Sequence, residues 1–394
     1  MNLMDHNKME TQQRSVTADL PTEIWWVILE FALEATLFAT TYEGDNWALD
    51  ANSKYVFMRY MNEYFESERE RKRMRRVCRS WKEFADARSN RFVDLHTISS
   101  PIRDDYTLDK ETIAHARCGR ILPRVTSEEI ARIADGVKWE VAIVSKNHAK
   151  ILGQVPHASL RRLDLSIDAP DGFDPNSFLE ILGSYRNLTW LTLSLDDAPN
   201  KPPLPLIPGK TPFVLPSLQT FVVRSRKAWI FPSFCLTSPN LRHLFLKSGT
   251  APKDITLRDL ISHYCQTLRS IAIVTGASLG RVRDQYFPPW TECPELEELA
   301  LDPALIVDFH PLPRTHPLRR IYTSQWTHEN LKNWLDSDNL KHIALVNAKL
   351  FPDGIGWMNG ALTEAIGTQN FELLNERARE KGIEMTNGGN WNSW

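Results

Sequence analysis

The residues best placed to do covalent chemistry are Gly276, Ser278 and Gly280, which form a G-x-S-x-G pattern directly after an apolar segment. In serine hydrolases this pattern is a nucleophile elbow, a sharp turn that exposes the serine hydroxyl at the end of a strand. An acid and a histidine follow in the order that a hydrolase needs, as Asp302 or Asp308 and then His310 or His316. The same small residues also suit a plain turn after a strand, so serine hydrolysis by Ser278 is kept as a remote alternative.

No other set of residues has the spacing of a metal, cofactor or disulfide site. The cysteines are scattered without a C-x-x-C pair, at Cys78, Cys118, Cys235, Cys265 and Cys293. This distribution favours reduced thiols in a core over a zinc site or a disulfide framework. Gly354 and Gly356 begin a dinucleotide-like pattern, but Asn359 stands at the third glycine position and no strand–helix context surrounds it. We therefore expect no cofactor, no metal and no catalytic residue, and a protein that is not an enzyme.

The composition is that of a near-neutral globular protein, with 394 residues, 42% hydrophobic residues and a formal net charge of −2. This charge supplies no overall positive field, which argues against nucleic acid as a partner. No apolar run approaches the length of a transmembrane helix, and the first residues lack the apolar core of a signal peptide, so no membrane contact is expected. We expect a cytoplasmic and/or nuclear protein with a disordered N-terminus over residues 1–17.

The elements that would position any site follow from a repeated L-x-x-L-x-L pattern, with other apolar residues allowed. Its copies begin at residues 160, 188, 218, 241, 268, 296, 318 and 340. These intervals are typical of leucine-rich repeats, in which a short strand buries its apolar face only by stacking against its neighbours. The pattern predicts an α/β solenoid over residues 136–386, a curved parallel sheet with helices and loops on its convex side.

Both ends of this predicted solenoid have their own signals. An additional strand is expected at residues 141–144, before the first copy of the pattern. At the other end, residues 371–385 predict a helix that closes at Gly382 and a last short strand, which together would cap the apolar edge. Residues 387–394 are expected to form a tail.

The concave side of the solenoid is the predicted binding surface for a target protein. Alternation along each strand points the third and fifth pattern positions, and the residue after the pattern, to this side. Aromatic residues there have no core to join, so we expect them to be exposed, as at protein interfaces. The predicted target-binding residues are Trp190, Arg224, His243, Phe245, Lys247, Arg320 and Tyr322. The basic members favour an acidic or phosphorylated segment; the alternative is that a loop or the N-terminal domain covers these strands.

Two helices are predicted before the solenoid. The segment DLPTEIWWVILEF (19–31) would begin its helix near Pro21 and carry one apolar stripe, formed by Leu20, Ile24, Val27, Ile28 and Phe31. The second helix is predicted through MRRVCRSWKEFADARSNRF (74–92), with Met74, Val77, Cys78, Trp81, Phe84 and Ala85 at helical spacing. Part of the intervening segment, around residues 55–65, is also expected to be helical and to continue into the arginine-rich segment.

This pair of segments resembles the F-box. Its L-P-x-E-I-x-x-x-I-L pattern matches Leu20, Pro21, Glu23, Ile24, Ile28 and Leu29, and its V-C-x-x-W pattern matches Val77, Cys78 and Trp81. The resemblance, to F-box proteins with C-terminal leucine-rich repeats that are abundant in basidiomycete fungi, implies a substrate-recognition subunit of a cullin-type ubiquitin ligase. It also implies that Leu20, Pro21, Glu23, Ile24, Ile28, Val77, Cys78 and Trp81 bind a Skp-type adaptor, and through it cullin. The F-box-like domain would span residues 18–98, with an insertion at about 33–68, and residues 99–135 would be a linker.

The densest basic run of the chain, residues 69–76, lies within this region. Glu66, Glu68 and Glu70 precede its cations, an arrangement that predicts the solvated face of a helix. A nuclear localisation signal is the alternative. The function implied by the resemblance is therefore that of a non-catalytic adaptor subunit, and a leucine-rich-repeat interaction scaffold with a degenerate F-box is the alternative function.

Overall fold

The computed structural model spans residues 1–394 and divides into two compact units. The helical unit comprises Met1–Phe38 and Phe57–Asn90, and the repeat unit comprises Ala39–Val56 and Arg91–Trp394. The structure describes residues 21–33, 37, 39–41, 56–87, 92–95, 116–121, 138–144, 152–153, 155, 158–168, 175–196, 213–225, 236–248, 261, 264–275, 285–286, 288–301, 307–323, 328–345, 349–351, 354–356 and 368–387.

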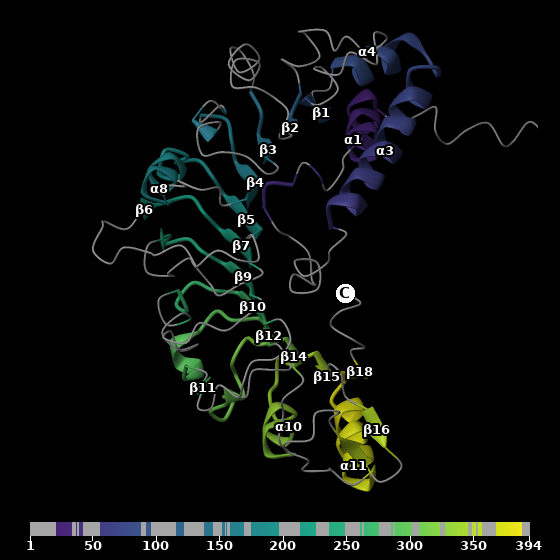
Figure 1. Ribbon diagram of the computed structural model, residues 1–394. Coiled ribbons are helices and arrows are strands. Elements are labelled where there is room, and N and C mark those ends of the chain that lie inside the picture. Colours follow the sequence, from purple (N-terminus) through teal and green to yellow (C-terminus); the bar gives the residue numbers. More distant parts are fainter. Residues whose placement is uncertain are drawn as a thin grey trace, which may run out of the picture. The chain divides into compact units, whose positions relative to one another are not determined.

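In its described part, the helical unit contains α1 (Thr22–Leu33), α3 (Val56–Met74) and α4 (Arg79–Ala87) (Figure 1). The helix predicted at 19–31 and the helical part of the predicted insertion are confirmed as α1 and α3. Leu29 and Leu33 of α1 pack against Met74 and Ala85 in a small buried cluster, with Trp81 and Phe84 of α4 against it. Leu37, Tyr60, Met61 and Tyr64 are also buried in this unit.

The single helix predicted over residues 74–92 is wrong, because the chain breaks between α3 and α4. The amides of Arg76 and Val77 bond the carbonyls of Arg73 and Met74, three residues back, so the last turn of α3 tightens and ends. The bond from the amide of Lys82 to the carbonyl of Cys78 then opens α4. Val77 and Cys78 therefore lie in the connection and are exposed rather than buried on a helix face.

The repeat unit is built on a 12-stranded sheet, counted over its described residues, whose strands pair in parallel (Figure 1). Its order is β1 (Phe92–Asp94), β2 (Cys118–Ile121), β3 (Val141–Val144), β4 (Arg162–Asp168), β5 (Trp190–Asp196), β7 (Thr220–Ser225), β9 (His243–Ser248), β10 (Ser270–Thr275), β12 (Glu298–Leu301), β14 (Arg320–Thr323), β15 (His342–Leu345) and β18 (Glu384–Asn387). The predicted α/β solenoid with a parallel sheet is confirmed.

Each predicted repeat supplies one strand of this sheet. The strand begins at the third position of the L-x-x-L-x-L pattern in all eight copies, and equivalent positions of successive copies pair, as Arg162 does with Trp190 and Trp190 with Thr220. The leading leucine of every copy is buried, at Leu160, Leu188, Leu218, Leu241, Leu268, Leu296, Leu318 and Leu340. The alternating apolar residues form one continuous core along the sheet.

Shorter elements lie along the outer side of the curved sheet, namely α8 (Pro175–Gly183), η6 (Trp290–Glu292), α10 (His328–Trp334), and paired short strands (Figure 1). These strands are β6 (Phe213–Val214) with β8 (Leu236–Thr237), β11 (Gln285–Tyr286) with β13 (Val307–Asp308), and β16 (Lys349–Phe351) with β17 (Gly354–Gly356). Asparagines join successive repeats on the approach to the strands, since the amide of Asn187 donates to the carbonyl of Ala158 and that of Asn240 to the carbonyl of Pro216.

The two ends of the sheet differ in how well they follow the sequence. The strand predicted at 141–144 is β3, and the predicted C-terminal cap is α11 (Thr368–Glu380), a turn at Gly382 with φ of +69°, and β18. The start predicted at residue 136 is wrong, because β1 and β2 precede it and continue the sheet. The predicted linker 99–135 thus contributes strand β2.

Candidate protein-interaction surfaces

The helical unit exposes an apolar face of α1. Five large hydrophobic side chains of this one helix are between 43% and 71% exposed: Ile24, Trp26, Val27, Ile28 and Phe31. Large aliphatic and aromatic residues are usually buried, and a contiguous exposed set of them marks a surface that binds another molecule. Ile24, Val27, Ile28 and Phe31 recur at three- to four-residue spacing and so share one side of the helix, which we call the α1 face. Trp26 lies on the other side, where its ring stacks on Phe84 of α4.

Aromatic contacts to α4 hold α1 in place beside this face. The rings of Trp25 and Trp81 lie with centroids 5.5 Å apart, and those of Trp26 and Phe84 stack at 6.5 Å. Aromatic pairs at these separations contribute beyond the area that they bury. Both contacts lie on the side of α1 that faces α4, so the α1 face stays exposed while the helix itself is anchored.

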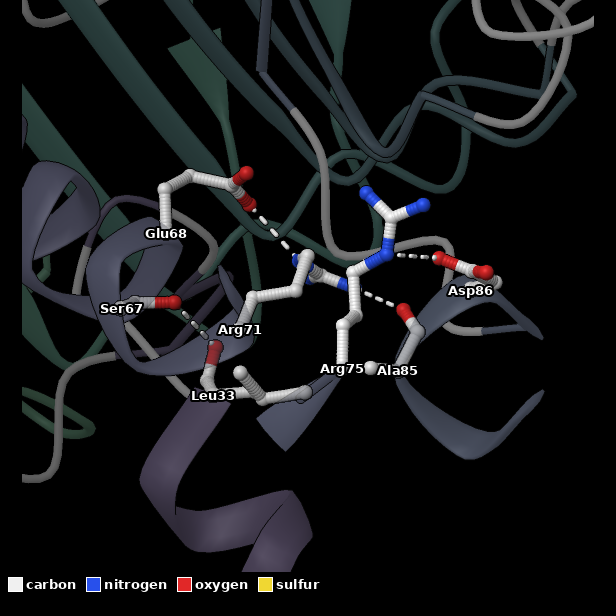
Figure 2. Close-up of polar contacts among 7 residues, drawn as sticks. All are labelled: Leu33, Ser67, Glu68, Arg71, Arg75, Ala85 and Asp86. Atoms are coloured by element: carbon white, nitrogen blue, oxygen red, sulfur yellow. Dashed lines mark hydrogen bonds and ion pairs between the residues drawn. The ribbon is translucent and has the colours of Figure 1, made fainter. Parts of the chain in front are cut away.

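Polar contacts fix the C-terminal ends of α1 and α4 to α3 (Figure 2). Arg71 of α3 is almost completely buried, and its guanidinium pairs with Glu68 at 2.8 Å and donates a hydrogen bond to the backbone carbonyl of Ala85. The hydroxyl of Ser67 donates to the backbone carbonyl of Leu33 at 2.9 Å. Carbonyls at a helix end lack partners within the helix, so these side chains complete the bonding of both ends.

A second ion pair joins the same helices nearby. Nε of Arg75, just after α3, lies 3.0 Å from Oδ1 of Asp86 in α4 (Figure 2). Together with Arg71 it means that two members of the basic run 69–76 bind α4.

The other cations of the basic run make contacts along the helix. Arg69 pairs with Glu66 and Arg73 with Glu70, each three residues apart, and the side chains are largely solvent-accessible. These pairs confirm the arrangement of acidic residues and cations predicted for a solvated helix face. Arg71 is the exception, because its side chain is buried between the helices.

The predicted adaptor-binding residues lie mostly at the surface of the helical unit. Pro21, Glu23, Ile24 and Ile28 are exposed on α1, and Trp81 is half-buried against Trp25. Val77 and Cys78 are exposed in the α3–α4 connection. Leu20 lies outside the described residues.

Two members of the α1 face, Val27 and Phe31, were not among the predicted adaptor-binding residues. The signal that could have identified them is the apolar stripe predicted for this helix, to which both residues belong.

On the concave face of the repeat unit, the aromatic residues are buried. Trp190 is 8% exposed, Phe245 0% and Tyr322 1%, so the expectation that they are exposed is wrong. In-register pairing explains part of this burial, because Phe245 lies between Val222 and Ala272 on neighbouring strands. These residues form a second apolar cluster with Val274, Ala300, Tyr322 and Ala344. Binding of a target by these residues stays a prediction.

Charged side chains lie over these aromatic rings. The guanidinium of Arg162 stands 4.3 Å from the ring centroid of Trp190, and that of Arg224 stands 6.0 Å from the ring centroid of Phe245. His342 meets Tyr322 edge to face at 5.5 Å. Cations above an aromatic face are attracted by it, and here they also cover it. Arg224, Lys247 and Arg320 remain partly exposed on this side, whereas Nδ1 of His243 is buried.

The first repeats also hold a short stretch from the predicted insertion. Arg162 pairs with Asp164 at 2.8 Å and donates to the backbone carbonyl of Ala39 at 3.1 Å, while the hydroxyl of Thr189 donates to the carbonyl of Thr40 at 2.6 Å. Residues 39–41 therefore belong with the repeat unit, against the start of β4 and β5. Their contacts satisfy a nearly buried arginine.

Burial lowers the pKa of two histidines in the repeat unit, His243 and His342. Burial, followed by the positive charges of Arg242 and Arg269, lowers the pKa of His243 to about 3. Burial also lowers the pKa of His342, whose Nε2 lies 2.8 Å from the hydroxyl oxygen of Thr386. These rings are held neutral near neutral pH.

The structure describes only some of the residues that were considered for hydrolysis. Ser278 and Asp302 lie outside the described residues, Asp308 ends β13, and His310 is exposed. His316 is buried: its Nε2 lies 3.0 Å from the carbonyl oxygen of Cys293, and its Nδ1 accepts the amide of Leu318 at 3.2 Å. Both ring nitrogens are thus used for structure, and burial lowers the pKa of this histidine.

Two further properties concern the part of the chain that the structure describes. There, no group of three or more His, Cys, Asp or Glu side chains is arranged to hold a metal ion. None of the described helices combines the length and the apolar character needed to cross a bilayer.

Comparisons with known proteins find a distant likeness among solved structures. No protein-family profile matches the chain, and no curated protein matches it. Among solved structures, the chain is similar to a crystal structure of a TLR13–ssRNA13 complex, with 14% sequence identity and a TM-score of 0.32. The match covers 63% of this chain and 42% of that chain, less than half of the neighbour's length.

Proposed function

We propose that this protein is a substrate-recognition subunit of a cullin-type ubiquitin ligase, in which the helical unit binds a Skp-type adaptor and the repeat unit binds a target protein. The observation that carries the proposal is the α1 face, four exposed hydrophobic side chains on one side of the helix that bears the F-box-like pattern. The exposed Val77 in the second F-box-like pattern adds to it. The mechanism is positional, and the chemistry of ubiquitin transfer belongs to the partner subunits of the ligase.

The physical reason for a protein partner is the cost of leaving the α1 face in water. Each fully buried aliphatic or aromatic side chain of this size contributes roughly 1.5–3 kcal/mol. Half-exposed side chains regain part of that free energy when a partner covers them. Trp25 and Trp81 brace the helix from the other side, so that little ordering is needed on binding.

The test is binding of purified full-length protein to a Skp-type adaptor, comparing Ile24→Ala/Ile28→Ala with Phe65→Ala. Phe65 is a matched control, since it is 54% exposed, apolar and on the same unit, but belongs to α3. Removing central hydrophobic anchors costs about 2 kcal/mol or more, so the double variant should weaken binding by at least about 30-fold. The control should bind as the wild type does.

Equal binding by the double variant would show that the α1 face is not the adaptor site. If the folded wild-type protein binds no adaptor at all, the proposal fails in favour of a repeat scaffold with a degenerate F-box. Circular dichroism of each variant checks that the fold is retained.

For the target, we infer an acidic or phosphorylated segment that lies along the concave face near β7 and β9. Arg224 and Lys247 are neighbours across these strands, and both are half-exposed. Adjacent cations on a rigid sheet suit carboxylate or phosphate groups, which form charge-assisted hydrogen bonds with them.

The double reversal Arg224→Glu/Lys247→Glu should therefore remove co-purifying targets from cells, while adaptor binding stays unchanged. Arg314→Glu/Lys332→Glu carries the same charge change at two exposed residues outside the parallel sheet and is the control. Loss of the same partners from both double variants would point to net charge rather than to the concave face.

A further inference from the structure

Two buried cysteines occupy equivalent places in neighbouring repeats. Strands β10 and β12 pair in parallel, with Ser270 opposite Glu298. Cys265 precedes Ser270 by five residues, and Cys293 precedes Glu298 by five residues. Both cysteines are therefore in the same position relative to paired strands, on the short turns that lead into them.

The two thiols lie close together inside the main core. Cys265 is 3% and Cys293 0% exposed, and both belong to the continuous apolar cluster of the repeat unit. Their side chains hydrogen-bond to each other. Neighbouring parallel strands run about 4.8 Å apart, and a disulfide accepts Cα–Cα distances of about 4.4–6.8 Å.

The backbone around the pair is well defined. The amide of Cys293 bonds the carbonyl of Trp290, and its own carbonyl accepts the amide of Leu296. The same carbonyl lies 3.0 Å from Nε2 of His316 in the next repeat. Because Cys293 is held from both sides, rotation of the cysteine side chains, and not movement of the strands, is what would bring the sulfurs together.

We propose that Cys265 and Cys293 form a peroxide-sensitive dithiol, a modification site at which a reversible disulfide links two neighbouring repeats. The oxidant is a hydroperoxide such as hydrogen peroxide. One thiolate attacks a peroxide oxygen, giving a sulfenic acid and a molecule of water once the leaving hydroxide takes up the proton released by the thiol. The second sulfur then attacks the sulfenic sulfur, the S–S bond forms, and a second water leaves. The two thiols lose two electrons and two protons, and the peroxide is reduced to two waters.

The two thiols influence each other's titration. The hydrogen bond between them lowers the pKa of Cys265 and raises that of Cys293, so the pair can hold one thiolate. Either cysteine can attack the peroxide, and the other then resolves the sulfenic acid. A small oxidant reaches the pair through local opening of the turns, which precede the strands.

The experiment treats purified full-length protein with hydrogen peroxide, alkylates the remaining thiols under denaturing conditions, and maps the peptides by mass spectrometry. A cross-linked peptide pair containing Cys265 and Cys293 is expected, lighter by two hydrogen atoms than the reduced pair and released by dithiothreitol. The control within the same molecule is Cys118, which is also buried and whose pKa is raised chiefly by burial. It should stay reduced at the same dose.

Two variants test the resolving step. In Cys293→Ala and in Cys265→Ala, the sulfenic acid on the remaining cysteine has no resolving thiol, and dimedone should trap it at a level above that of Cys118. Both alanine replacements avoid a buried hydroxyl, and circular dichroism checks their fold.

The wild-type map decides the proposal even if a variant is unstable. Cys265 and Cys293 that stay as reduced as Cys118, at a dose that oxidises the exposed Cys78, would overturn it. So would cross-links from either cysteine to Cys78, Cys118 or Cys235 at similar yield, because they would show oxidation of an unfolded chain.

Discussion

Replacing Arg71 tests how the helical unit holds α1 and α4 together. Arg71→Met keeps most of the aliphatic stem of the side chain but removes the guanidinium that bonds the carbonyl of Ala85 and pairs with Glu68 (Figure 2). The carbonyl of Ala85 then loses its buried partner at the end of α4. The change should therefore loosen the junction between α3 and α4.

The magnitude follows from the two lost contacts. A hydrogen bond from a charged donor to a buried carbonyl contributes about 1.5–3 kcal/mol. Glu68 is one-quarter exposed, so water can replace the guanidinium there, and the ion pair adds at most about 1 kcal/mol. The expected loss is about 3 kcal/mol of local stability, which corresponds to about 100-fold faster opening.

Hydrogen exchange followed by mass spectrometry measures this loss separately in each unit of the full-length protein. Amides of α1 and α4 should exchange about 100-fold faster in Arg71→Met, while those of β5 and β7 should not change. Arg73→Met is the matched control, since the Arg73 side chain is 73% exposed and its pair with Glu70 lies at the surface. The control should cost less than about 1 kcal/mol.

Equal exchange in the two variants would refute the reasoning that Arg71 joins the helices. A uniform increase in both units would refute it as well, because the effect would then not be local. If the helices are loosened as expected, adaptor binding should fall in Arg71→Met and not in Arg73→Met.

Three further predictions concern the repeat unit. Gly119→Ala should lower the free energy of unfolding of this unit by about 1–3 kcal/mol, measured by chemical unfolding, because an added Cβ would stand 2.4 Å from the Trp139 ring. Gly382→Ala should cost only about 1–2 kcal/mol of backbone strain, because Gly382 has a φ of +69° and open space around it. Equal stability of Gly119→Ala and the wild type would contradict this. The folded-state pKa of His243, about 3, lies below its ordinary value of about 6.5, so the unfolded chain binds the proton first as the pH falls. The contribution of neutral His243 to the free energy of unfolding is therefore fully present above about pH 6.5. It is lost as the pH falls toward about 3, at up to about 1.4 kcal/mol per pH unit. Urea unfolding at several pH values should show this slope, and it should be shallower in His243→Gln; an unchanged slope would exclude His243 as its source. Finally, a fluorophosphonate probe should not label the purified protein, and labelling that disappears in Ser278→Ala would revive the hydrolase alternative.

The repeat strands could be predicted because each copy carries its own complete signal. The leading leucine and the alternating apolar residues specify both the position and the face of the strand, and every strand starts at the same pattern position. β2 carries no such signal, because its core position is Gly119, in line with Ala142 and Leu163. The ring of Trp139, just before the next strand, fills the volume above this glycine. The core residue therefore lies elsewhere in the sequence, and a pattern search cannot find the strand.

The break between α3 and α4 could not be predicted from periodicity. Met74, Val77, Cys78 and Trp81 continue a helical spacing, and neither glycine nor proline interrupts the segment. What ends α3 is tertiary, because Arg71 and Arg75 bond α4 only when that helix turns back against them. The apolar residues therefore keep their three- to four-residue spacing along the sequence although the chain changes direction between α3 and α4.

The same limit explains the opposite outcomes for the two predicted surfaces. Alternation or helical spacing places apolar residues on one face but does not say what covers that face. On the concave side of the sheet, in-register neighbours and overlying arginines bury Trp190 and Phe245. On α1, the helix buries Leu29 and Leu33 against Met74 and Ala85, and the α1 face on its other side has no such neighbours among the described residues. The exposure of that face is the strongest physical reason to expect a protein partner on this helix.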